Sequence, residues 1–94
     1  MSAARAALEA QLQELAAVEK KTLTEHLNTV RGIEEVHKWK ARTAALIAQH
    51  LGPAAAKSFA DTKPGPSFTN DLFEEFSDEV EVYRTSLRAL MKSL

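Results

Sequence analysis

The most regular hydrophobic pattern in this chain is an apolar stripe in its last third. Its members recur at alternating spacings of three and four residues: Phe73, Phe76, Val80, Tyr83, Leu87, Leu90 and Leu94. On an α-helix this alternation aligns the side chains along one narrow face, which a second helix must cover. We therefore predict a helix over residues 70–94 that packs through this heptad stripe, with Thr69 or Asn70 as its N-cap.

A second apolar stripe opens the chain, in a segment without glycine or proline. It begins with Leu8, Leu12 and Leu15 and resumes in a shifted phase at Leu23, Leu27 and Val30. The segment is rich in strong helix formers, and such a shift of phase is typical of a bend or stutter. The pattern predicts one long helix over residues 2–30.

Gly32 is the first residue of the chain that readily supports a helix break. If the helix breaks there, a second helix covers residues 33–51, with Glu34 and Glu35 near its positive end. If the helix instead continues through Gly32, the cost is about 1 kcal/mol. We favour the break.

Proline and glycine mark the next boundaries. Gly52 and Pro53 end the second helix, and Pro53 suits the first position of a new one. We predict a short helix over residues 53–60, anchored by Phe59, and a loop over the proline-containing residues 61–68. The chain is therefore predicted to be a single domain, residues 1–94, and an all-α small helical bundle of three long helices plus one short helix.

The charge balance limits the classes of partner. The chain has 12 Lys and Arg against 13 Asp and Glu, a formal net charge of −1. Proteins that bind nucleic acids and helices that lie on membrane surfaces normally carry an excess of cationic residues. Because this chain has none, we expect neither a nucleic acid nor a membrane as its partner. There is no cysteine, and no apolar run is long enough to act as a signal peptide or to span a membrane. The expected localisation is cytoplasmic.

The densest local cluster of chemistry-bearing side chains is His37-Lys38-Trp39-Lys40-Ala41-Arg42. Its cations Lys38, Lys40 and Arg42 are candidate contacts for nucleic acid or for an acidic partner. Trp39 falls on the opposite, apolar side of the helix, where we expect it to anchor the core. The cations can also pair with the carboxylates of the last helix, which would set how the two helices pack.

Catalytic and metal-binding patterns are sparse. Arg31 and His37 have the Arg-x5-His spacing, which resembles the ribonuclease motif of HEPN domains, where arginine and histidine handle phosphate charge and proton transfer. Glu34 lies three residues before His37, but one carboxylate and one imidazole are too few ligands for a metal site. We expect no catalytic residue, no metal and no cofactor, and hence a protein that is not an enzyme.

Residues 33–94 resemble a known kind of helical region. The features that carry the resemblance are Trp39-Lys40-Ala41-Arg42-Thr43, then Gly52, Phe59, and a closing helix with Leu87, Leu90 and Leu94. They are similar to the small helical modules in front of effector domains in bacterial nucleotide-sensing and antiphage defence proteins, including those with TIR domains. The resemblance implies an adaptor or oligomerisation module whose partner enzyme lies elsewhere.

These observations favour a non-catalytic protein–protein interaction module that works by homo-oligomerisation or as an adaptor. A shallow, alanine-rich core favours self-association, because it buries little area per residue. The expected interaction surface is the two apolar stripes: Leu8, Leu12, Leu15, Phe73, Phe76, Val80, Tyr83, Leu87, Leu90 and Leu94. A small nucleic-acid-binding regulator or antitoxin that uses residues 37–42 is the alternative, and a HEPN-like ribonuclease is the third reading.

Overall fold

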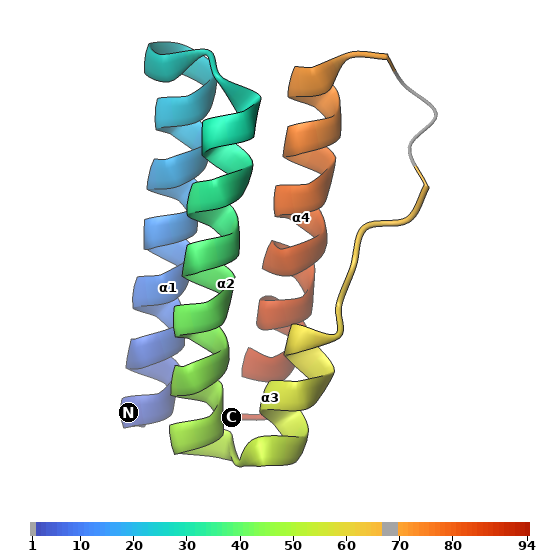
Figure 1. Ribbon diagram of the computed structural model, residues 1–94. Helices are drawn as coiled ribbons and strands as arrows, with labels where there is room; N and C mark the ends of the chain where they lie inside the picture. The colour runs from blue at the N-terminus through green and yellow to red at the C-terminus, as the bar shows by residue number, and fades with distance from the viewer. Residues whose placement is uncertain (1, 67–69) are drawn as a thin grey trace.

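The computed structural model describes residues 2–66 and 70–94, and its regular elements there are all helical (Figure 1). This confirms the predicted all-α fold. The elements are α1 (Ala3–Lys21), a π-helical turn η1 (Thr22–His26), α2 (Thr29–Leu51), α3 (Pro53–Ala60) and α4 (Leu72–Met91). The bounds of α3 are those that the sequence predicts, because Pro53 takes the first helical position after Gly52.

The break between the first two long helices lies at Leu27 and Asn28, so the predicted helix over residues 2–30 and the break at Gly32 are wrong. Leu27 adopts the left-handed conformation with φ 50°. The side chain of Asn28 then accepts a hydrogen bond from the backbone N–H of Arg31 at 3.1 Å and caps α2. The shift in phase of the apolar residues before this turn corresponds to η1. In this π-helical turn each backbone hydrogen bond joins residues five positions apart instead of four, so the helix is locally wider.

Gly32 lies inside the first turns of α2, and packing rather than backbone freedom explains it. A Cβ at this position would lie 2.5 Å from Cγ2 of Thr22 and 2.9 Å from Cε1 of Phe76. Both neighbours are buried side chains, one from η1 and one from α4. The absence of a side chain at Gly32 therefore lets the α1–α2 hairpin and α4 approach closely.

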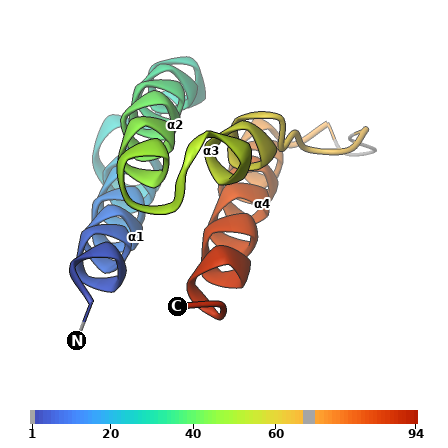
Figure 2. The same ribbon diagram turned by 90° about the horizontal axis from the view of Figure 1, so that it is seen from below.

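Three long helices lie side by side, and the short α3 packs against α2 and α4 at one end of the bundle. In the view of Figure 2, α3 lies between α2 and α4, while α1 lies on the other side of that pair. Trp39 is 0 % exposed at the centre, which confirms that it anchors the core. Its Nε1 donates a hydrogen bond to the carbonyl oxygen of Gln11 at 2.7 Å, and its ring meets Phe59 edge to face at 6.0 Å between centroids.

The two predicted apolar stripes lie mostly inside this single chain. Leu8, Leu15, Phe76, Val80, Tyr83 and Leu87 are buried, and Leu12 and Leu90 are partly buried against them. Their side chains therefore form the core of the monomer, which leaves little of either stripe available to a partner.

The closing stripe leaves the core at both of its ends. Phe73 is 41 % exposed and Leu94 is 37 % exposed, and Met91 is the buried residue after Leu87. An α-helix has 3.6 residues per turn, so a strict heptad drifts off the buried face over several turns. The helix predicted over residues 70–94 also ends earlier, at Met91, and begins after Asp71, whose carboxylate caps it; Thr69 lies outside the described residues.

Candidate functional site

Helices α2 and α4 face each other along a seam on the side of the bundle where α3 packs. The α2 side of this α2–α4 seam is a stripe at helical spacing: Ile33, His37, Lys40 and Ala44. One end of the seam is covered by α3 and the residues after it. There, Nζ of Lys40 donates to the carbonyl oxygen of Thr62 at 2.6 Å, and the Thr62 hydroxyl lies 3.2 Å from that of Ser86 on α4.

A polar bridge crosses the middle of the seam. Nε2 of His37 on α2 lies 2.9 Å from Oε2 of Glu79 on α4, and the hydroxyl of Tyr83 donates to the same oxygen at 2.7 Å. Nζ of Lys40 lies 4.5 Å from the centroid of the Tyr83 ring, in a cation–π contact. Glu79 thus accepts from two side chains at once, and the bridge ties α4 to α2.

Burial shifts the pKa values of two side chains in this bridge, Tyr83 and Lys40. Burial, together with the hydrogen bond to Glu79, raises the pKa of the Tyr83 hydroxyl, because a phenolate there would be poorly solvated and close to a carboxylate. Burial also lowers the pKa of Lys40, an effect that the charge of Glu79 opposes. At neutral pH the phenol is therefore a hydrogen-bond donor and not a base.

The raised pKa of Tyr83 predicts a loss of stability at alkaline pH. The unfolded chain gives up its phenol proton near pH 10, whereas the folded chain holds it to higher pH. Above about pH 10 the native state binds more protons, so the free energy of unfolding falls as the pH rises. In urea unfolding at a series of alkaline pH values, we expect a steeper decline for the wild type than for Tyr83→Phe. Equal declines would show that Tyr83 does not cause the loss.

The other end of the α2–α4 seam is open and forms an apolar groove. Its volume is ≈ 390 Å³, and it is lined by Thr29, Val30, Ile33, Glu34, Leu72, Glu75, Phe76 and Glu79. Val30 on α2 is 69 % exposed and Leu72 on α4 is 62 % exposed, so an exposed aliphatic side chain lines the groove on each of its two helices. Phe76 lies beneath them as part of the buried core. This α2–α4 groove lies at the end of the bundle where α1 turns into α2, far from α3 and from both termini (Figure 1).

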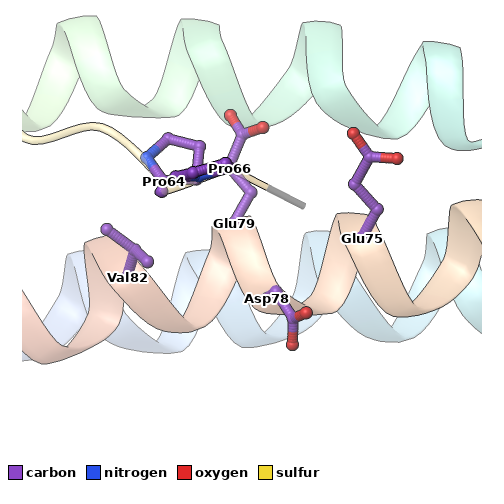
Figure 3. Close-up of a pocket in the computed structure, with 7 residues that line it drawn as sticks. Pro64, Pro66, Glu75, Asp78, Glu79 and Val82 are labelled. Carbon is purple, nitrogen blue, oxygen red and sulfur yellow. The ribbon is translucent and has the colours of Figure 1, made fainter. Parts of the chain in front are cut away.

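Carboxylates surround the apolar centre of the groove. Glu34 lies on its α2 side, whereas Glu75 and Glu79 lie on its α4 side, and none of its lining residues is Lys or Arg. A neighbouring pocket of ≈ 200 Å³ under Pro64 and Pro66 shares Glu75 and Glu79 and adds Asp78. In Figure 3, Glu75 and Glu79 point from α4 toward α2, while Asp78 points the opposite way. The groove is therefore apolar in its middle and negative along its sides.

The predicted basic contact residues do not form one face. Lys38 lies 3.9 Å from Glu35 of its own helix, Arg42 pairs with Glu14 of α1, and Lys40 lies on the opposite side of α2, in the seam. Among the described residues, the ion pairs of Lys38 and Arg42 are therefore not with the carboxylates of α4, as expected, and the contact of this cluster with such a carboxylate is that of His37 with Glu79. Nucleic-acid binding needs a continuous basic surface, and these side chains do not form one.

The Arg31 and His37 pair does not converge on one site. Both residues lie on the continuous helix α2, where six positions correspond to roughly 120° around the axis. Arg31 lines a small pocket with Lys21 and His26, whereas His37 contacts Glu79 across the seam. The geometry gives the two side chains no common substrate position.

Within residues 2–66 and 70–94, no three His, Asp or Glu side chains lie close enough together to hold a metal ion. None of the described helices is both long and apolar enough to cross a membrane. Comparison of the chain with family models, with curated proteins and with solved structures found no match.

The groove was not predicted from the sequence. Leu72 lies one position before the heptad stripe of α4 and was therefore not included in it. Val30 was assigned to the end of a first helix over residues 2–30, whereas in the structure it belongs to the first turn of α2. A usable signal was present: Leu72 and Phe73 are consecutive apolar residues at a helix start, so both cannot face the core.

Proposed function

We propose that this protein is a non-catalytic interaction module that binds a helix of a partner protein in the α2–α4 groove. The observation that carries the proposal is the exposure of Val30 and Leu72 on the two sides of a groove whose floor is the core residue Phe76. Contiguous exposed apolar side chains with polar residues around them are typical of protein-binding surfaces.

A helix suits the groove because a helix already covers the rest of the seam. At the closed end, α3 packs between α2 and α4 and places Phe59 in the core. The lining residues of the open end span about two turns of each helix, roughly 10 Å. A partner helix with apolar side chains at positions i, i+3, i+4 and i+7 would continue the layer that α3 begins.

Of the two forms of this function, adaptor binding is favoured over self-association through the groove. A symmetric dimer would place the same surface of each chain against the other. Glu34 and Glu75 of one copy would then face those of the second copy, and opposed like charges cost binding energy. The resemblance of residues 33–94 to the helical modules of defence proteins implies an adaptor or an oligomerisation module and does not distinguish the two forms.

The proposal predicts that a neutral amphipathic peptide binds the groove. The probe is a helix of about 14 residues, long enough for four turns, with Leu at i, i+3, i+4 and i+7 and Gln elsewhere. We expect saturable binding by fluorescence anisotropy, with changes of amide NMR signals confined to the starts of α2 and α4. The double variant Val30→Asp with Leu72→Asp should weaken binding at least about tenfold, because it places charge where apolar surface must be buried.

Leu94→Asp is the matched control. Leu94 is also an exposed leucine, but it lies at the opposite end of the bundle (Figure 1). The control should bind the peptide as the wild type does. Because Val30 and Leu72 are exposed in the free chain, their replacement should leave the circular dichroism spectrum unchanged. Absence of peptide binding, or equal binding by all variants, would refute the proposal.

A further inference from the structure

We infer that the helix that occupies the α2–α4 groove is cationic, with apolar side chains on one face and Lys or Arg on both flanks of that face. The inference rests on the proposed function and goes further by naming the chemistry of the partner. It follows from where the carboxylates of the groove lie.

The carboxylates flank the apolar centre from two sides. Glu34 projects from α2 and Glu75 from α4, and both side chains are exposed. They line the same groove as the apolar side chains of Val30 and Leu72. Neither glutamate has an ion-pair partner among the described residues. A helix in the groove would therefore meet an unneutralised carboxylate along each of its flanks, and cations at those positions supply complementary charge.

The contrast with the covered end of the seam supports the same conclusion. There the seam already contains a cation, because Lys40 lies over the Tyr83 ring and donates to Thr62. The helix that packs at that end, α3, is rich in alanine and has a single lysine. The open end has Glu34, Glu75 and Glu79 and no lysine or arginine in its lining. The two ends therefore favour helices of different charge.

A second copy of this chain is a poorer occupant than a cationic partner helix. Its cationic segments with an exposed leucine are the end of α4, where Arg88 and Lys92 accompany Leu94, and the turn after α1, where Lys20 and Lys21 precede Leu27. Each segment exposes a single leucine, because Leu90 and Leu23 pack against the core. One leucine supplies too little apolar surface for a groove of ≈ 390 Å³.

The test compares three peptides that share the same leucines. The neutral peptide with Gln is set beside one with Lys and one with Glu at the positions that flank the leucine face, and affinities are measured by fluorescence anisotropy. At low salt we expect the Lys peptide to bind about tenfold more tightly than the Glu peptide, with the neutral peptide between them. Salt of about 0.5 M should remove most of this difference, because it screens exposed charges.

Charge reversal in the protein locates the effect. The double variant Glu34→Lys with Glu75→Lys should prefer the Glu peptide. The control Glu9→Lys with Glu25→Lys changes the net charge equally at exposed positions outside the groove, so it should keep the preference for Lys. A control that reverses the preference as well would overturn the inference, because net charge and not the groove would then decide affinity.

The remaining outcomes separate this inference from the proposed function. Equal binding of the three peptides, still lost in Val30→Asp with Leu72→Asp, would overturn the cationic partner and leave the interaction module intact. Failure of all three peptides to bind would remove both. An oligomer of the protein alone in sedimentation, dissociated by Leu72→Asp, would show that a second copy fills the groove and would also overturn the inference.

Discussion

Leu87→Asp is expected to leave the chain without a stable fold. Leu87 is 0 % exposed in the core between the helices. Truncating a buried leucine costs about 2–5 kcal/mol, and an aspartate there adds the cost of an unpaired buried charge. Small domains have a total stability of roughly 5–15 kcal/mol, so the combined loss is comparable to all of it. Far-UV circular dichroism and urea unfolding would show a low helix content without a cooperative transition.

The same change at Leu94 is the matched comparison. Leu94 belongs to the same sequence stripe but lies after the end of α4 and is partly exposed. We expect Leu94→Asp to change the free energy of unfolding by less than about 1 kcal/mol. If Leu87→Asp instead gave a folded species of lower mass than the wild type, Leu87 would contact a second chain and not the core of its own.

Gly32→Ala is expected to destabilise the protein by about 1–3 kcal/mol, although the residue lies in a helix. In an exposed helix interior, alanine is favoured over glycine by about 1 kcal/mol. Here the new Cβ would lie 2.5 Å from Cγ2 and 2.7 Å from Oγ1 of Thr22. The hydroxyl of Thr22 donates to the carbonyl oxygen of Val18 at 2.9 Å, so the side chain cannot move without losing that bond. Urea unfolding at neutral pH would show whether Gly32→Ala raises or lowers the free energy of unfolding.

Two variants make this result specific. Ala45→Gly, at an exposed position of the same helix, should lose about 0.5–1 kcal/mol from helix propensity alone. In the background of Thr22→Ala, the cost of Gly32→Ala should become smaller, because the nearest obstructing atoms are gone. A stabilising effect of Gly32→Ala in the wild-type background would mean that η1 and α2 do not approach each other as closely as described.

Much of the fold follows from local chemistry that can be read along the chain. The spacing of apolar residues indicated three long helices, although the break between the first two lies at Leu27 and Asn28 and not at Gly32, and the Gly52-Pro53 pair placed both ends of the α2–α3 junction. The position of Trp39 among apolar neighbours at helical spacing indicated a core residue. These inferences succeed because helix periodicity, capping and proline geometry act over a few residues.

The candidate site was less accessible from the sequence. Val30 and Leu72 are 42 positions apart and come together only because α4 packs against α2. The basic cluster at residues 37–42 is continuous in the sequence and suggested a single contact surface. Its cations contact different neighbours, because successive residues of a helix are about 100° apart around its axis. Which side chains share a surface depends on packing between helices.

The sequence by itself determined that this protein is helical and which faces of its helices are apolar, since both depend on short-range spacing and propensity. The tertiary structure decided the meaning of Gly32, because a glycine that ends a helix and one that admits a close neighbour are identical in sequence. It also decided which apolar residues remain exposed: the short α3 covers only one end of the α2–α4 seam, and the groove is the part left uncovered.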